Sequence, residues 1–367
     1  MRLISINVLK TGMVIGRQIL NEAGLPLIQK DVVVTDGLIS RLKQLDIQYV
    51  YIEDKISQGI EIEETVPIAV RKKAIKQITN AFNKIKGLDQ KSASLVIEKQ
   101  TKEIGNLVDN LLDSILNNEE ILMILSDTLL YDDYIYQHSF QVTLYSLAIA
   151  KEMGYSESDL RTIGIGAILH DVGKMVTPSE ILFKPGRLTN EEFETMKQHA
   201  RSGFDILRNL HTVSLLVAHC AFQHHERIDG SGYPRALVDY EIHPFAKVIA
   251  VADVFDAVTS NRVYRKKMIP SQGIEIIEAG RGTMFDAKVV DALKKSVVHY
   301  PNGSILLLSD GRRGVVSKQN DDDAALPCLR IFEENNQLLN TTYQLNLIEE
   351  PNIAIEKVET EYILEVE

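Results

Sequence analysis

The chain has few cysteines. Cys220 and Cys328 are the two in its 367 residues, and they lie far apart in the sequence. A disulfide framework needs more cysteines, and a zinc knuckle needs them at a short paired spacing, so both kinds of scaffold are excluded. We expect both thiols to be buried and reduced.

Long apolar runs are also missing. No uninterrupted run approaches the roughly 18 residues that would cross a bilayer. Asn7 and Lys10 interrupt the N-terminal segment before the apolar core of a signal peptide could form. We therefore expect a cytoplasmic protein with no membrane partner.

Positive charge is scarce, because 40 lysines and arginines face 51 aspartates and glutamates, a net charge of −11. Affinity for DNA, RNA or an anionic membrane surface depends on neutralising phosphates, so this balance opposes all three. A small phosphorylated ligand is still compatible, because bound metal ions would supply the local positive charge.

The remaining composition is that of a folded globular protein, with 45% hydrophobic and 25% charged residues. The length exceeds what one core usually holds, which predicts a principal domain with smaller modules. We expect a multidomain protein: an all-α domain flanked by small β-rich modules. The predicted segments are a β-rich module in 1–55, a helical linker or connecting region in 56–122, a helical domain in 123–298 and a second β-rich module in 299–367.

Turn signals and periodicity support this division. Asp310-Gly311 between two apolar runs predicts a β-hairpin in the last module. Apolar residues from Ile104 to Leu116 repeat at helical spacing. That helix is expected to pack on its own domain, with dimerisation or signal relay as the alternative. In the first module, short β-rich runs at 13–15, 25–28 and 32–34 precede a helix at 38–45 and a strand at 49–54.

Candidate metal ligands are spread in order along the helical segment. A lone histidine on an apolar helix face is more often a hydrogen-bonded core residue than a ligand. Carboxylates on such faces are costly to bury without a cation or a polar partner, and imidazole with carboxylate is the donor set that borderline divalent metals prefer. Taken together, these residues predict a metal centre: His138, His170, Asp171, His199, His224, His225 and Asp253.

Local patterns place these side chains on helices or at helix ends. His138 shares an apolar face with Val142 and Tyr145. Gly173 is expected to let the chain turn after the adjacent pair His170-Asp171. Thr189 and Glu192 form a capping box that begins a helix carrying Phe193, Met196 and His199 inward. The remaining histidines are expected to be structural or solvated, namely His211, His219, His243 and His299.

The same residues resemble a known family. HDVGK at 170–174, FKPGRLTNEE at 183–192, HHERIDGSGYP at 224–234 and ADVFDAVTSNRVYRK at 252–266 are similar to the HD-GYP phosphodiesterases of the HD superfamily of metal-dependent phosphohydrolases. The resemblance covers about 123–298. It implies an all-α HD-type core that binds two or three metal ions, commonly iron or manganese. It also implies hydrolysis of cyclic dinucleotides, chiefly cyclic di-GMP, to linear pGpG or GMP.

Carried over by position, the resemblance assigns roles. The metal ligands named above would include Asp171 as the residue that bridges two metals, and a metal-bridging hydroxide would be the nucleophile. Lys174 would lie beside the scissile phosphate and, with Asp171, form the catalytic pair. Arg262 and Arg265 would contact the substrate phosphates, a role that suits the planar arginine fork; surface ion pairing is the alternative. Tyr233, in the GYP loop, would lie near the substrate.

One position departs from part of the family. Members with three metals have a glutamate four residues before the first histidine, where this chain has Tyr134. Asp133 is one step earlier, about 100° away around a helix. We therefore expect two divalent metal ions, either iron or manganese.

Two other functions remain open. A regulator that binds a cyclic dinucleotide and signals by contact would keep the pocket, but it would not need a metal pair or Lys174. Another HD-type hydrolase, such as a nucleoside triphosphohydrolase, is disfavoured by the histidine pair and the GYP loop. A homodimer, and a protein partner that contacts the GYP loop or the flanking modules, are both compatible with the sequence.

Overall fold

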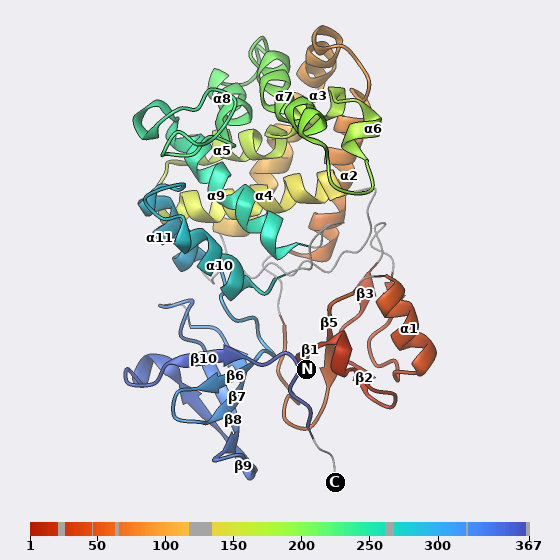
Figure 1. Cartoon of the computed structure of the whole chain (residues 1–367), viewed down its shortest axis with the longest axis vertical. Helices are drawn as coiled ribbons and strands as arrows, with labels where there is room; N and C mark the ends of the chain where they lie inside the picture. Colours follow the sequence, from red (N-terminus) through yellow and green to blue (C-terminus); the bar gives the residue numbers. More distant parts are fainter. Residues whose placement is uncertain are drawn as a thin grey trace.

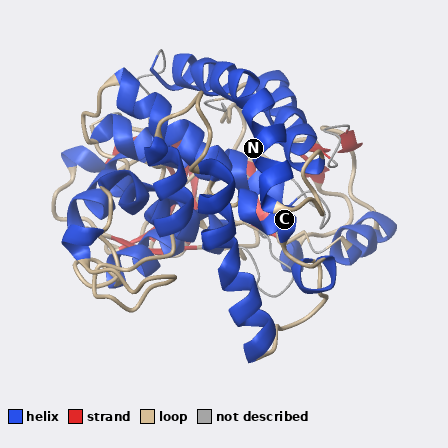
Figure 2. Cartoon of the chain, turned by 90° about the horizontal axis from the view of Figure 1, so that it is seen from above, coloured by secondary structure: helices blue, strands red, loops and turns tan. Residues whose placement is uncertain are grey.

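A helical part and a β-sheet part divide the molecule (Figure 1). The computed structural model describes residues 1–20, 26–45, 47–62, 66–116, 134–260, 268–320 and 322–364. The two sheet-forming regions, one from each end of the chain, lie at the same end of the helical part. Seen from above, the helices pack side by side and the strands show only between and beside them (Figure 2).

The helical part begins well before the predicted helical domain. Its long helices are amphipathic or buried. The short turn η2 (Val172–Val176) follows the helix that ends at Leu169. The helices are α2 (Ile68–Asn83), α3 (Gln90–Leu116), α4 (Tyr134–Glu152), α5 (Glu157–Leu169), α6 (Ser179–Leu182), α7 (Asn190–Leu207), α8 (Leu215–Gln223), α9 (Pro244–Thr259), α10 (Pro270–Ala279) and α11 (Ala287–Ser296).

Helix starts in this part follow local capping rules. The Ser156 side chain accepts a hydrogen bond from the Asp159 amide at the start of α5. The predicted capping box of Thr189 and Glu192 is present at the start of α7. Each cap satisfies an amide that the first helical turn leaves without a partner. These caps set where α5 and α7 begin. His170 directly follows α5, and His199 lies on α7.

One detail of α7 differs from the prediction. His199 is buried, but Phe193 is 49% exposed. Residues spaced by three drift around a helix of 3.6 residues per turn, so Phe193 and His199 are about 120° apart. Phe193 therefore does not share the inward face of His199.

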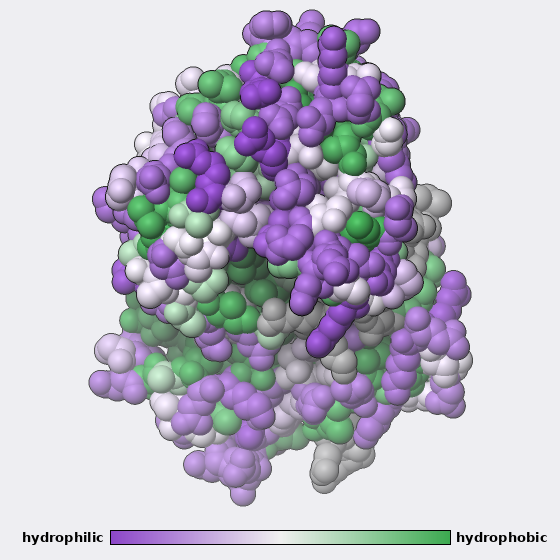
Figure 3. Space-filling model, turned by 45° about the horizontal axis from the view of Figure 1, so that its top comes forward, coloured by the Kyte–Doolittle hydropathy of each residue, from purple (hydrophilic) through white to green (hydrophobic). Residues whose placement is uncertain are grey.

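A single large core runs through the helices. It includes the apolar face of α3, with Ile104, Leu107 and Val108 buried, and continues through α4, α5 and α9. Residues of the predicted linker thus contribute to the same core as the helical domain, and the amphipathic face of α3 is packed within the chain. The face drawn in Figure 3 is mostly hydrophilic over the helices, while hydrophobic residues gather in the hollow beside the β-sheet part.

The N-terminal region forms a small antiparallel sheet in the order β1-β5-β2, with β1 (Arg2–Ser5), β2 (Val14–Ile15) and β5 (Tyr49–Glu53). β3 (Ile19–Leu20) pairs with β4 (Pro26–Ile28), and α1 (Asp36–Gln44) packs beside the turn η1 (Ile6–Val8). The run at 32–34 gives only a bridge between Val33 and Val14 rather than a strand.

The C-terminal region forms a five-stranded antiparallel sheet in the order β10-β6-β7-β8-β9. The hairpin predicted around Asp310-Gly311 is confirmed, and Gly311 has a φ of 85°, which suits glycine. The turn at Asn335-Asn336 also has positive φ at both residues. The strands are β6 (Ile305–Leu308), β7 (Arg313–Lys318), β8 (Cys328–Glu334), β9 (Gln337–Asn346) and β10 (Ile355–Val358).

The two β-sheet regions contact each other directly. The Leu3 amide donates to the Gly303 carbonyl at 2.9 Å, and the Ser5 amide donates to the Thr360 carbonyl at 2.7 Å. Ile60 and Phe332 belong to one buried cluster that both regions share. Residues from opposite ends of the chain therefore stabilise one unit.

The hydropathy of the helices and the state of the two cysteines bear on the features that the sequence has little of. Among the described helices, none combines the length and the apolar character needed to span a membrane. Both cysteines are free thiols, as expected. Cys220 is fully buried but Cys328 is only partly so, because Cys328 begins the strand β8 near the surface.

Candidate metal centre

All seven predicted ligand side chains lie together inside the helical part. His138 comes from α4 and Asp253 from α9, two helices that pack against each other. His199 comes from α7. Two adjacent pairs follow directly on the last residues of α5 and α8, namely His170-Asp171 and His224-His225. The ends of these helices, rather than their faces, therefore orient the four side chains. Except for His225, which is partly exposed, all are buried.

The Asp171 carboxylate lies between two sets of imidazole nitrogens. Its Oδ2 is 3.6 Å from His138 Nε2 and 3.3 Å from His170 Nε2. Its Oδ1 is 3.4 Å from His199 Nε2 and 3.8 Å from His224 Nε2. We call His138 and His170 the first ligand group, and His199, His224 and His225 the second ligand group. Ligand atoms of each group lie within 4.8 Å of one another and of Asp171.

Asp253 also lies between the two ligand groups. Its Oδ1 is 3.0 Å from His138 Nε2, and its Oδ2 is 3.7 Å from His225 Nδ1. The two carboxylates therefore each present one oxygen to the first group and the other to the second. Carboxylates that bridge in this way are suited to holding two cations at short separation.

Backbone carbonyls orient most of the rings. The Nδ1 atoms of His170, His199 and His224 lie 2.7, 2.7 and 2.9 Å from the carbonyl oxygens of the residues three positions earlier. A carbonyl oxygen accepts, so Nδ1 carries the proton and Nε2 keeps its lone pair. In each ring, Nε2 is the atom that faces Asp171. The local helix geometry thus directs the Nε2 lone pairs of His170, His199 and His224 toward the Asp171 carboxylate.

His138 is oriented differently. Its Nδ1 lies 2.6 Å from Asp256 Oδ2, a buried carboxylate one turn after Asp253 on α9. The Ser260 hydroxyl donates to the other Asp256 oxygen at 2.7 Å. Asp256 is not among the predicted ligands, and its contact with His138 depends on how α4 and α9 pack.

These residues fit a pair of divalent cations. Within the described part of the chain, His170 Nε2 and Asp171 Oδ1 are buried and have no hydrogen-bond partner. A buried polar atom without a partner is costly, and a cation at either position would remove that cost. Nitrogen and carboxylate oxygen donors in this mixture suit iron, manganese or zinc rather than calcium or magnesium.

Burial and charge shift the pKa values of the centre in opposite directions. Burial lowers the pKa of His199 to about 4, and burial with neighbouring histidines holds the pKa values of His224 and His225 well below the usual range. Burial alone would also lower the pKa of His138, but its hydrogen bonds to Asp253 and Asp256 raise it to about 8. The second ligand group is thus neutral near pH 7, as metal ligation requires.

Lys174 contributes a cation beside the carboxylates. Its Nζ lies 2.5 Å from Asp171 Oδ2, and its side chain is 20% exposed. Burial alone would raise the pKa of Asp171, but Lys174 and the nearby histidines hold it well below the usual range. Lys174 therefore contacts the buried centre while part of its side chain is exposed to solvent.

The loop after α8 covers the second ligand group. The Tyr233 ring stacks on the His225 ring, with centroids 4.6 Å apart, and its amide donates to the His225 carbonyl. Glu226, also buried, accepts from the amides of Arg235 and Leu237 and so holds the loop from inside. Glu226 belongs to the HHERIDGSGYP motif but is not among the predicted site residues.

The glycines near the centre act mainly through close approach. Gly230 has a φ of 80°, as expected for a turn glycine. A Cβ on Gly232 would lie 2.4 Å from the Glu226 backbone, and one on Gly173 would lie 2.0 Å from the His199 carbonyl oxygen. Gly173 was expected to allow a turn, but its φ is not positive. It is required instead because the chain after Asp171 packs directly against α7.

Some predicted residues cannot be placed. Arg262 and Arg265 lie outside the described residues, as does Asp133, and the Tyr134 side chain is not described. Of the other histidines, His299 is buried and bonds to the Lys294 carbonyl, whereas His243 caps α9. Neither belongs to the two ligand groups, which agrees with the structural roles expected for them.

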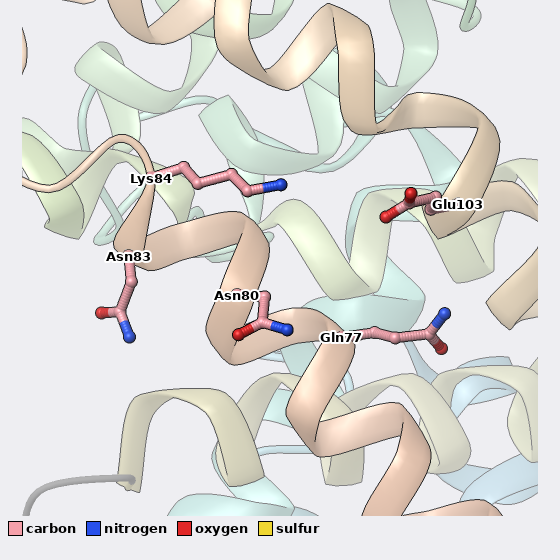
Figure 4. Close-up of a pocket in the computed structure, with 5 residues that line it drawn as sticks. All are labelled: Gln77, Asn80, Asn83, Lys84 and Glu103. Atoms are coloured by element: carbon pink, nitrogen blue, oxygen red, sulfur yellow. The ribbon is translucent and has the colours of Figure 1, made fainter.

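A polar pocket lies elsewhere, between α2 and α3 (Figure 4). Gln77 and Asn80 come from α2 and Glu103 from α3. The pocket does not include any residue of the two ligand groups. Its polar side chains are exposed except for Gln77, which is half-buried, in contrast to the buried metal centre.

Comparison with known proteins agrees with this geometry. Residues 119–289 match the HD domain family. A cyclic di-GMP phosphodiesterase from Pseudomonas aeruginosa is 37% identical over 63% of this chain and 56% of its own length. One from Thermotoga maritima is 39% identical over 62% of this chain and 60% of its own length. A 3'3'-cGAMP-specific phosphodiesterase from Vibrio cholerae is 36% identical over 45% of this chain and 36% of its own length.

The helical part, with its buried histidines and aspartates, is thus similar to HD domains over residues 119–289. The resemblance noted in the sequence is confirmed at this level. The chain spans less than two thirds of the length of each of these curated relatives.

Proposed function

We propose that this chain is a metal-dependent phosphodiesterase that hydrolyses cyclic di-GMP to linear pGpG or GMP. The observation that carries the proposal is the position of Asp171, whose two oxygens face two separate sets of imidazole nitrogens. Such an arrangement suits a pair of cations acting on a phosphodiester. Two of the relatives described above are named for cyclic di-GMP, which favours the same substrate.

The cofactor in this proposal is two divalent metal ions, either iron or manganese. The first ligand group with Asp253 would hold one ion, the second ligand group would hold the other, and Asp171 would contact both. When bound, such ions polarise a phosphoryl oxygen and lower the pKa of water. The prediction of two rather than three ions still rests on Tyr134 in the sequence.

Side chains of this chain would bind and orient the substrate. Lys174 Nζ, next to Asp171, would stabilise negative charge that develops on the phosphoryl oxygens. Tyr233 would contact the substrate beside the second ligand group, and burial raises the pKa of Tyr233, so its phenol stays neutral. Arg262 and Arg265 are proposed to bind the substrate phosphates.

The surrounding regions are proposed to tune this centre rather than to form it. We propose that the chain divides into modules 1–55, 56–122, 123–298 and 299–367. We also propose that it is cytoplasmic and that it forms a homodimer or binds a protein partner. The contacts between the two β-sheet regions support their acting as one unit.

Product analysis with a substrate panel tests the proposed function. The full chain, purified without oxygen and supplied with Mn²⁺ or Fe²⁺, is offered cyclic di-GMP, the mixed guanine–adenine cyclic dinucleotide and a nucleoside triphosphate. We expect pGpG or GMP from cyclic di-GMP, no product after chelation, and unchanged turnover in His211→Ala, which removes an exposed histidine outside the centre. Turnover of the triphosphate alone would overturn the proposal in favour of another hydrolase.

The mixed cyclic dinucleotide is a second candidate substrate, since a relative from Vibrio cholerae is named for it. A higher kcat/KM for the mixed substrate than for cyclic di-GMP would support this candidate. Metal bound in the centre without turnover of either cyclic dinucleotide would favour a regulator that signals by binding.

A further inference from the structure

His138 is the one ligand-group histidine whose ring lies between two carboxylates in the described part of the chain. Asp253 Oδ1 is 3.0 Å from Nε2, and Asp256 Oδ2 is 2.6 Å from Nδ1. Asp253 and Asp256 are one turn apart on α9, so both face α4. His138 and Asp256 are 2% and 1% exposed, so water does not compete for these contacts.

We propose that Asp256 is a positioning residue for the first ligand group, which sets the tautomer and donor strength of His138 while Ser260 holds Asp256 in place. This inference rests on the proposed function only in that it assumes a divalent cation at His138 Nε2. It assigns a role to a residue outside the predicted ligand set.

The physical argument begins with the proton on His138. A carboxylate accepts but cannot donate when it is ionised, so the short contact to Asp256 places a proton on Nδ1. The lone pair of the neutral ring is then on Nε2, the atom that faces Asp171 and Asp253. A carboxylate behind an imidazole also makes it a stronger donor than a neutral carbonyl does.

The anchoring of Asp256 supports a positioning role. Its second oxygen accepts from the Ser260 hydroxyl at 2.7 Å, and the Ser260 amide donates to the Asp256 carbonyl at 2.9 Å. Ser260 caps the C-terminal end of α9. The helix cap therefore restrains the carboxylate that restrains the ligand, and both oxygens of the buried Asp256 are satisfied.

Asp256→Asn tests the inference by metal affinity rather than by turnover. The asparagine keeps the volume but loses the charge. We expect the ion associated with the first ligand group to bind about 10- to 100-fold more weakly, the usual effect of losing such a partner. The ion at the second ligand group should keep its affinity. Titration of the metal-free full chain with Mn²⁺ against a competing chelator measures both.

A double-mutant cycle separates positioning from simple packing. If Asp256 acts through His138, Asp256→Asn should change Mn²⁺ affinity no further in a His138→Ala background, yet keep its full effect in a His224→Ala background. Equal effects in both backgrounds, or wild-type affinity at both sites in Asp256→Asn, would overturn the inference. The cycle measures Mn²⁺ affinity and not turnover. Its result therefore still holds if the chain does not hydrolyse cyclic di-GMP.

Ser260→Ala provides an independent arm in case Asp256→Asn does not fold. It should weaken Mn²⁺ binding at the same site by a smaller factor, because Asp256 keeps its contact with His138. Thr259→Val is the matched control, since the Thr259 hydroxyl donates to the Phe255 carbonyl instead. Equal Mn²⁺ affinity in Ser260→Ala and wild type would contradict the role given to Ser260.

Discussion

The two ligand groups on either side of Asp171 are built from the same residue type but differ at one ring, because a carboxylate lies behind His138 whereas a carbonyl oxygen lies behind His170, as in the second group. In the second group, carbonyl oxygens orient His199 and His224, and burial keeps their pKa values low. In the first group, Asp253 and Asp256 flank His138 and raise its pKa to about 8. Histidines in one cluster therefore need not be equivalent ligands.

This difference has a consequence for metal binding. Negative charge inside a buried site attracts a cation more strongly than neutral groups do, because little water screens it. The first group has carboxylates on both sides of one ring, whereas the second presents mainly neutral nitrogens. We expect the ion at the second group to leave first when a chelator is added.

The largest effect should come from Asp171, the residue that the two groups share. Asp171→Ala should lower kcat by at least about 10³-fold, since it removes an oxygen from both sites. Asp171→Asn keeps one carbonyl oxygen and should retain about one ion instead of two. Steady-state kinetics with elemental analysis measures both quantities. Wild-type kcat in Asp171→Ala, with metal content unchanged, would show that the carboxylate does not join the groups.

Removing one histidine from each group separates them. His138→Ala and His224→Ala should each lose one ion and about 100-fold or more in kcat, because both cations are needed. His138→Ala should also lower the free energy of unfolding of the metal-free chain more than His224→Ala does, by about 1–3 kcal/mol, because it leaves Asp256 buried without that partner. Elemental analysis and denaturant unfolding give the two readouts. Equal stability losses would contradict the difference between the groups.

A change at Lys174 affects the side of Asp171 that faces the first group. Lys174→Ala should keep both ions but lower kcat by about 10²-fold, the typical loss when a donor to a developing charge is removed. Mn²⁺ affinity should hold or rise, since the ammonium no longer competes for Asp171 Oδ2. Lys197→Ala, in an α7 residue whose Nζ pairs with exposed Glu194, is a matched lysine control for metal affinity. Loss of metal in Lys174→Ala would instead assign the lysine a structural role.

The smallest effect should be the pH dependence of stability in the metal-free chain. Histidines of the second group have folded pKa values below the unfolded value near 6.5, so the unfolded chain takes up protons first as pH falls from about 7 to 5. The free energy of unfolding should then fall, by up to about 1.4 kcal/mol per pH unit for each such proton.

His138 has the opposite sign. Its raised pKa gives stability that is fully present below about 6.5 and is lost as pH rises through about 8. The slope between pH 7 and 5 should therefore be shallower in His199→Ala and steeper in His138→Ala. Denaturant unfolding at each pH measures this. Parallel slopes in the two variants would remove the electrostatic contrast between the groups.

Much of the centre could be predicted from the sequence because its ligands occur in local patterns. His170-Asp171 and His224-His225 are adjacent pairs, and the capping box before His199 sets the start of its helix. The fold class, the hairpin at Asp310-Gly311 and the helical character of the middle of the chain were read from similar short-range signals.

What could not be predicted depends on contacts between distant segments. Asp256 bonds to His138 across 118 positions, and no local pattern distinguishes it from other aspartates. The close approach of Gly173 to α7 and the pairing of the two β-sheet regions have the same origin. Phe193 was misplaced because a three-residue spacing does not follow a helix of 3.6 residues per turn.

The central claim is that Asp171 joins two cation sites, and anomalous X-ray diffraction from crystals of the Mn²⁺-loaded chain tests it most directly. The account predicts two anomalous peaks, one between Asp171 Oδ2 and the first ligand group and one between Oδ1 and the second. A single peak, or two peaks of which neither contacts Asp171, would contradict it.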